Sequence, residues 1–148
     1  MRAVIQRVSE ACVMIDGTIH ASIEKGCVIL LGIRTGDTRD AALFLADKCS
    51  SLRVFDDANG KMNLGLNDVG GSVIVVSQFT LYGDAQKGNR PSFIEAARPE
   101  EAEPLYDIFV GRMKSLLGSD RVATGIFRTM MKVKIVNDGP VTILIESK

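Results

Sequence analysis

Histidine is almost absent from this sequence, since His20 is the only one among 148 residues. A metal site of the H-E-x-x-H type, and any chemistry that needs several histidines, are therefore excluded. A Ser-His-Asp triad would have to recruit His20, which is predicted beside a hairpin strand, where an exposed histidine is the simpler interpretation. Neither G-x-x-x-x-G-K-[ST] nor G-x-G-x-x-G occurs, so those two nucleotide-binding loops are missing. We expect no metal and no cofactor.

Cysteines are few and widely spaced, at Cys12, Cys27 and Cys49. An odd number without close spacing suits reduced thiols in the cytosol. Together with His20 they would supply four zinc ligands, but the short spacing typical of structural zinc is missing, which favours core thiols. No apolar run approaches the roughly 20 residues that cross a bilayer, and charge returns at Arg7, too early for a signal peptide. We expect a cytoplasmic protein that does not enter a membrane.

The sequence also lacks an excess of charge of either sign, because 18 Lys and Arg residues balance 18 Asp and Glu residues. This argues against bulk electrostatic binding of nucleic acid and leaves room for a local basic patch. Apolar residues make up 46% of the chain, and its length suits one domain with a sizeable core. No linker, repeat or low-complexity segment interrupts it. We predict a single domain over residues 1–148.

The first third of the chain has the pattern of strands. Residues 2–8 and 11–15 are predicted to be extended, and Asp16-Gly17 then favours a tight hairpin because glycine accepts positive φ. Residues 18–23 would form the returning strand. The unbroken apolar run at residues 27–31 is typical of a strand that is buried on both faces.

Two helices are expected. The first would be capped by Asp37 or Thr38 and continue to about residue 51. The second would begin near Pro99 or Pro104 and stop at Gly118, which matches the chemistry of helix ends. Their predicted apolar faces, at helical period, are Ala41, Leu45, Cys49 and Leu52 in the first helix and Leu105, Phe109, Met113 and Leu116 in the second.

The remaining segments complete an α+β pattern. Residues 56–71 are predicted to be loop, residues 73–76 a buried strand, and residues 83–98 an excursion. Residues 131–136 and 141–145 would be strands joined by a turn. Many strands with two main helices predict a curved or barrel-like, mostly antiparallel sheet covered by the helices.

The segment Ser77-Gln78-Phe79-Thr80-Leu81-Tyr82 follows the buried strand. Strand ends suit chemistry because the scaffold holds them rigidly while hydroxyl groups emerge at the edge. Serine and threonine at such a place are more often caps or turn residues. Spacing alone leaves both interpretations open.

The segment Asn137-Asp138-Gly139-Pro140-Val141-Thr142 also has two interpretations. A Gly-Pro step between strands is ordinarily a turn. The alternative is a cis peptide bond, which before proline costs only about 0.5–1 kcal/mol. A cis step can turn two neighbouring carbonyl groups in one direction, and such a pair suits an ammonium group.

Taken together, these segments resemble the D-aminoacyl-tRNA deacylase family, formerly called D-Tyr-tRNA(Tyr) deacylases. The resemblance runs nearly from end to end. The segments that carry it are Met1-Arg2-Ala3-Val4-Ile5-Gln6-Arg7-Val8, Gly60-Lys61-Met62-Asn63-Leu64, Ser77-Gln78-Phe79-Thr80-Leu81-Tyr82, Lys87-Gly88-Asn89-Arg90-Pro91-Ser92-Phe93 and Asn137-Asp138-Gly139-Pro140-Val141-Thr142.

The resemblance implies an esterase for chiral proofreading, which hydrolyses D-aminoacyl-tRNA and glycyl-tRNA mischarged on tRNA(Ala), and rejects L-aminoacyl-tRNA. It also implies a homodimer with active sites at the subunit interface. Ser77, Gln78, Phe79 and Thr80 would form one wall of the pocket, and we expect the backbone N–H groups around Phe79 and Thr80, at a strand end, to supply an oxyanion site. Gly139 and Pro140 of the partner subunit, joined by a cis peptide bond, would hold the substrate's amino group. The adjacent ribose 2′-hydroxyl would orient or activate the attacking water.

The chain departs from the family pattern at Arg128, where a small glycine usually follows the phenylalanine that is here Phe127. The residues that would contact the tRNA are less well defined. Phe79 and Phe93 are candidates for stacking on the terminal adenine, and phosphate contacts are predicted among Lys87, Arg90, Arg98, Arg128, Lys132 and Lys134, each of which is otherwise ordinary surface charge. Two alternatives stay open, a non-catalytic tRNA-binding dimeric module and a small esterase for a metabolite.

Overall fold

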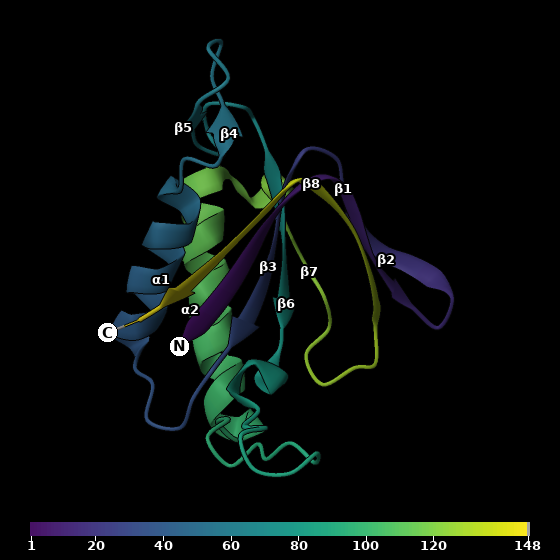
Figure 1. Cartoon of the computed structure of the whole chain (residues 1–148), viewed down its shortest axis with the longest axis vertical. Helices are drawn as coiled ribbons and strands as arrows, with labels where there is room; N and C mark the ends of the chain where they lie inside the picture. The colour runs from purple at the N-terminus through teal and green to yellow at the C-terminus, as the bar shows by residue number, and fades with distance from the viewer. Residues whose placement is uncertain (148) are drawn as a thin grey trace.

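The computed structural model describes residues 1–147 and forms one α+β domain. Two helices lie side by side on one side of a strongly curved sheet (Figure 1). The strands are β1 (Arg2–Ile15), β2 (Thr18–Ile23), β3 (Gly26–Gly32), β4 (Phe55–Asp56), β5 (Met62–Leu64), β6 (Ser72–Ser77), β7 (Val122–Thr124) and β8 (Lys132–Glu146), and the helices are α1 (Arg39–Ser51), α2 (Pro99–Leu117) and the 3₁₀ turns η1 (Phe79–Tyr82) and η2 (Ser119–Arg121).

The main sheet has the order β2-β1-β3-β6-β7, and β8 pairs with β1. Strand β1 is antiparallel to β2, β3 and β8, whereas β6 runs parallel to both β3 and β7. The predicted α+β class with a barrel-like sheet and two main helices is confirmed, and the sheet is mixed. Its parallel part brings the carboxyl ends of β3 and β6 to the same edge, where the polar segment after β6 begins.

The predicted hairpin and the ends of the first helix are confirmed, but the predicted apolar face of that helix is confirmed only in part. Asp16 and Gly17 have φ of 49° and 79°, the left-handed values that a two-residue hairpin turn requires. Helix α1 is capped by Thr38, whose Oγ1 accepts a hydrogen bond from the amide of Ala41 at 3.2 Å. Leu45 and Cys49 are buried, whereas Ala41 and Leu52 are half-buried, and Ala42 and Ala46 complete the buried face.

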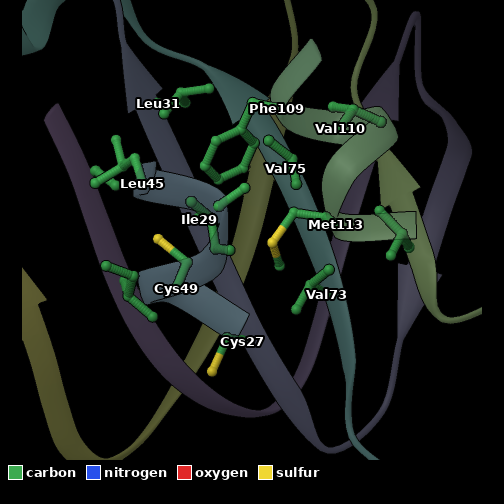
Figure 2. Packing of buried hydrophobic residues seen from close by; sticks show 14 of the residues in the cluster. Cys27, Ile29, Leu31, Leu45, Cys49, Val73, Val75, Phe109, Val110 and Met113 are labelled. Carbon is green, nitrogen blue, oxygen red and sulfur yellow. The ribbon is translucent and has the colours of Figure 1, made fainter. Parts of the chain in front are cut away.

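The core lies between the helices and the inner face of the sheet. Strands β3 and β6 are apolar on both faces because they lie in the middle of the sheet, and Phe109 and Met113 of α2 fill the space above them (Figure 2). Cys27 and Cys49 are part of this packing. Burial raises the pKa of each thiol to about 12.

The second helix has the predicted ends but a different buried face. It begins at Pro99, and Gly118 follows its last residue with φ 100°. Leu105 and Leu116 are only half-buried, whereas Phe109 and Met113 are buried as predicted. The buried face is Ala102, Tyr106, Phe109, Val110, Met113 and Leu117. The face is rotated because α2 must contact both α1 and the sheet.

Three further predictions are corrected. Residues 2–8 and 11–15 are one strand, β1, and residues 56–71 are not all loop, because β4 and β5 form a short antiparallel pair there. The short strand β7 was not predicted. The predicted turn at residues 137–140 is wrong: β8 continues through it, and both of its halves pair with β1. His20 is exposed on β2, as its simpler interpretation predicted.

No helix within residues 1–147 is both long and apolar enough to cross a membrane. In the same residues no group of three or more His, Cys, Asp or Glu side chains is arranged to hold a metal ion.

Candidate functional site

The polar segment after β6 is held against the end of β3. The amide of Gln78 donates to the carbonyl oxygen of Leu31 at 2.8 Å, which extends the β3–β6 pairing, and the chain then enters η1. A Cβ atom at Gly32 would lie 3.0 Å from Leu81 Cβ and 3.2 Å from the Gln78 carbonyl oxygen. Glycine at this position therefore lets η1 pack directly on the strand end.

Thr80 is exposed in η1, and both its side chain and its carbonyl group make hydrogen bonds there. Its Oγ1 accepts a hydrogen bond from the side-chain amide of Gln78, and its carbonyl oxygen accepts one from the amide of Gly83 at 2.9 Å. The first amide N–H groups of a helical turn have no acceptor within the turn. The amides of Phe79 and Thr80 occupy that position in η1, so the main chain offers donors here.

A cavity of about 640 Å³ opens beside this segment. Its wall is mostly apolar, and it lies between the end of β6, the start of α2 and the segment before β8. The lining residues are Ile33, Val76, Ser77, Gln78, Phe79, Phe93, Ala96, Ala97, Pro99, Ala102, Phe127, Arg128, Thr129, Met130, Met131 and Val133. Three of the four predicted wall residues, Ser77, Gln78 and Phe79, therefore line one cavity, and Thr80 follows them directly.

Two aromatic rings stand at the mouth of the cavity. Phe79 and Phe93 make an edge-to-face contact with centroids 5.2 Å apart and an interplanar angle of 72°. A Cβ atom on Gly83 would lie 2.8 Å from the Phe93 ring, so the glycine allows the ring to approach the backbone. Phe79 is 56% exposed and Phe93 is 37% exposed, which leaves ring surface available to a ligand.

The second predicted segment forms a bulge in β8. Val8 of β1 pairs with Asn137 and Gln6 pairs with Thr142, so the residues between them leave the ladder. The Asn137 side chain closes the bulge, because its Oδ1 accepts from the Val141 amide at 3.1 Å and its Nδ2 donates to Thr142 Oγ1 at 3.0 Å. Within the bulge, Gly139 has φ 127° and its bond to Pro140 is cis.

Arg7 of β1 anchors the bulge through a hydrogen bond, and this role of Arg7 was not predicted from the sequence. Its side chain is buried, with Nε donating to the Asp138 carbonyl oxygen at 3.0 Å and Nη1 donating to the Val54 carbonyl oxygen at 2.7 Å. The signal was present: Ala3, Ile5 and Arg7 alternate along β1, so they share its buried face. A buried arginine on that face must have acceptors.

One chain does not bring the two segments together. The bulge residues Gly139 and Pro140 are exposed and are not part of the cavity wall. In Figure 1 the bend of β8 lies in the upper half of the molecule, below β4 and β5, whereas the chain leaves β6 toward the bottom. A single site built from both segments would require a second copy of the chain.

The basic residues differ in their surroundings. Lys134 is paired with Glu10 at 2.5 Å, and this hydrogen bond raises its pKa. Lys87, Arg90 and Arg98 are exposed on or next to the excursion, and Lys132 is exposed at the start of β8. Arg128 lines the cavity.

Arg128 also adopts φ of 60°, the left-handed region. Glycine enters this region freely, whereas other residues do so at a cost. Residue 128 therefore has the backbone conformation that glycine favours, although it is an arginine.

With this geometry established, comparison with known proteins decides the family. The sequence profile described as D-Tyr-tRNA(Tyr) deacylase matches residues 4–146. The chain belongs to this family. Membership of a deacylase family places it among hydrolases of ester bonds, and confirms the resemblance that the two polar segments carried.

Similar proteins match over essentially their whole length. A protein of Koribacter versatilis (strain Ellin345) named D-aminoacyl-tRNA deacylase is 53% identical, over 100% of this chain and 98% of its own. One with the same name from Halalkalibacterium halodurans (strain ATCC BAA-125 / DSM 18197 / FERM 7344 / JCM 9153 / C-125) is 49% identical, over 100% of both. The solved structure titled c-Myc DNA Unwinding Element Binding Protein has a TM-score of 0.95 and 38% identity, and covers 100% of this chain and 99% of that chain.

Proposed function

We propose that this protein is a D-aminoacyl-tRNA deacylase that acts in the cytoplasm. It hydrolyses the ester between a D-amino acid and the terminal ribose of tRNA, also removes glycine mischarged on tRNA(Ala), and leaves L-aminoacyl-tRNA intact. The observation that carries the proposal is the match to the deacylase family over residues 4–146, which includes both polar segments.

The active site is proposed to form between two subunits. The cavity wall at residues 77–80 belongs to one subunit, and the Gly139-Pro140 bulge of the partner completes it. Two observations support a partner: the bulge is exposed at a distance from the cavity of its own chain, and β8 pairs, within residues 1–147, only with β1. The free edge of β8 carries apolar side chains, among them Leu144, which is 57% exposed.

The chemistry requires a positioned water and stabilisation of the negative charge that develops on the carbonyl oxygen of the ester. We assign that stabilisation to the amide N–H groups of Phe79 and Thr80. Water adds to the carbonyl carbon, the bond to the ribose oxygen breaks, and that oxygen leaves with a proton. No histidine lies on the described cavity wall, so the neighbouring ribose 2′-hydroxyl is assigned the task of orienting or activating the water.

Selectivity follows from fixing the α-carbon at two of its substituents. The partner's Gly139 and Pro140 carbonyls hold the amino group, and the oxyanion site holds the ester. The side chain and the hydrogen of the α-carbon must then take the two remaining directions. Main chain that fills the direction of an L side chain rejects the L-aminoacyl ester by steric clash. Glycine carries hydrogen in both of these directions, so it does not clash.

One assay tests the function directly. The purified protein is given D- and L-aminoacyl-tRNA that carry the same amino acid on the same tRNA, and glycyl-tRNA, and hydrolysis of each ester is measured. The D- and glycyl-esters should be cleaved, and the L-ester should not. Tight binding of tRNA without turnover would favour the non-catalytic tRNA-binding dimer. Cleavage of free amino-acid esters at the same rate as charged tRNA would favour a metabolite esterase.

Gly139→Ala tests the bulge, and Gly60→Ala is its matched control. Both glycines have positive φ, but a Cβ atom at Gly60 meets nothing within 4 Å, whereas at Gly139 it would lie 2.8 Å from Val141 Cγ2 and 3.0 Å from Arg7 Nη2. We expect turnover to fall about 100-fold or more in Gly139→Ala, because a displaced site group is costly. Gly60→Ala should keep it. Equal activity of the two variants would contradict the assignment.

Mixed dimers test the sharing of the site. Ala96→Trp places a large side chain in the cavity, and should be inactive alone, as should Gly139→Ala. If each subunit lends its bulge to the other, random mixing of the two variants restores one intact site in half of the dimers, about a quarter of wild-type activity. Failure to regain activity in mixed dimers that sedimentation shows to have formed would refute the shared site.

Two substrate and side-chain tests address the mechanism. A substrate with a 2′-deoxy terminal ribose should be cleaved poorly, and normal cleavage would remove the role of the hydroxyl. Thr80→Ala should retain substantial activity, because the site relies on main-chain donors. Complete loss of turnover in Thr80→Ala, together with an acyl-enzyme trapped in the wild type, would instead indicate a covalent nucleophile.

A further inference from the structure

One charged residue lines the cavity. Arg128 is the only ionisable side chain among the cavity-lining residues of the described chain, and no carboxylate faces it there. The rest of the wall consists of apolar side chains with a few neutral polar ones. The Arg128 side chain is exposed to solvent, so it adds nothing to the packing of the core, and its place beside the cavity suits an anionic group of a ligand.

Arg128 is held in place by the residues on each side of it. The ring of Phe127 packs against Tyr106 of α2 with centroids 5.8 Å apart. The sulfur of Met131 accepts a hydrogen bond from the Ile126 amide at 3.4 Å, and would lie 2.6 Å from a Cβ atom on Gly125. Both ends of this short segment are therefore fixed, and the arginine between them lines the cavity with a strained backbone at φ 60°.

Its guanidinium group also has no acceptor within residues 1–147. Within these residues six arginines donate to an acceptor, namely Arg2, Arg7, Arg34, Arg53, Arg112 and Arg121, whereas Arg39, Arg90, Arg98 and Arg128 do not. Of these four, only Arg128 lines the cavity. For Arg128 no hydrogen bond or ion pair is present in the described chain. All of its donors are free to bind a ligand.

We infer that Arg128 binds the phosphate that joins the terminal nucleoside of tRNA to the nucleotide before it. This inference rests on the proposed function. In an aminoacyl ester the carboxyl group is already esterified, so the anionic groups of the ligand are its phosphates. The planar guanidinium matches phosphate oxygens in a two-pronged arrangement, while the apolar wall and the rings of Phe79 and Phe93 suit the nucleoside.

The test compares binding of adenosine 5′-monophosphate with binding of adenosine, measured by titration calorimetry. The 5′-phosphate of the nucleotide occupies the place of the phosphodiester. The wild type should bind the nucleotide about tenfold more tightly, as expected for a charge-assisted contact. Arg128→Asn removes the charge with a residue that tolerates left-handed backbone, and should bind both compounds equally. Arg128→Lys should retain part of the preference.

The control is Arg39→Asn, which makes the same change of charge at the start of α1, outside the cavity, and should behave as the wild type. With D-aminoacyl-tRNA as substrate, Arg128→Asn should lower kcat/KM about tenfold, mainly through KM. A preference for the nucleotide that survives in Arg128→Asn would overturn the inference, and so would equal or undetectable binding of both compounds by the wild type. Absence of deacylation by the wild type would instead refute the proposed function, since the binding comparison does not depend on turnover.

Discussion

The contacts of Arg7 allow the cost of removing it to be worked out. In Arg7→Met the side chain keeps its length and apolar character but loses the donors to the carbonyl oxygens of Asp138 and Val54. Each hydrogen bond from a charged donor contributes about 1.5–3 kcal/mol. Methionine also avoids the desolvation of a guanidinium group, so we expect the free energy of unfolding to fall by about 2–4 kcal/mol. The melting temperature should fall by roughly 5–15 °C.

Urea unfolding followed by circular dichroism measures this loss, and Asp56→Asn is the matched control. Asp56 lies 3.5 Å from Arg7 Nη1, but its side chain is 52% exposed, so its removal should cost less than about 1 kcal/mol. In Arg7→Met, deacylation should also fall about tenfold or more at temperatures where the variant remains folded, because the bulge loses its anchor. If the two substitutions lower the free energy of unfolding by the same small amount, the hydrogen bonds from Arg7 to the buried carbonyl oxygens do not stabilise the bulge more than the ion pair with Asp56 does, and the prediction is wrong.

Two further predictions concern the core. Gly26→Ala should cost more than about 3 kcal/mol, because the new Cβ atom would lie 1.7 Å from the main-chain oxygen of Ser72; a near-normal urea midpoint would contradict this. In the folded protein Cys27 and Cys49 should resist a thiol reagent that modifies the half-buried Cys12 much faster, as mass spectrometry of time points would show. Burial raises the pKa of Cys27 and Cys49 from about 9 to about 12, so their contribution to stability is complete below pH 9. It should decline as the pH rises toward 12, because the unfolded chain releases these protons first, and a stability that increases over that range would be inconsistent with the assigned burial.

Local signals in the sequence were sufficient wherever neighbouring residues decide the structure. The apolar run at residues 27–31, the Asp16-Gly17 turn and the Thr38 cap each act through contacts with residues close in the chain, and all three are present as predicted. The same holds for the strand that precedes the polar wall of the cavity.

Long-range contacts explain the failures. Gly139-Pro140 has the composition of a turn, but both flanks of this step pair with β1, which lies more than a hundred residues earlier, and that pairing keeps the chain extended. The face of α2 was misjudged for a similar reason, because Leu105 and Tyr106 lie on neighbouring faces of one helix. Packing on α1 and the sheet, not the apolar period alone, selects Tyr106, whose hydroxyl donates to the Val75 carbonyl oxygen at 2.9 Å.

Arg7 was missed because a charged residue in a strand is usually assigned to the exposed face. Its acceptors lie in the bulge of β8 and just before β4, both far away in the sequence, so neither could be named from the sequence around it. Residues 77–79, in contrast, are consecutive and follow a strand whose end could be located, and they lie together along one cavity.

The two halves of β8 belong to different parts of the interior. Val133 and Ile135 contact the smaller apolar cluster, while Ile143 and Ile145 contact the larger one, and each half has its own register with β1. The bulge between them is therefore held by neither half but by side chains that reach it, Arg7 from β1 and Asn137 at its base. The position of the Gly139-Pro140 step thus depends on a few polar contacts and not on the apolar packing of the strand that contains it.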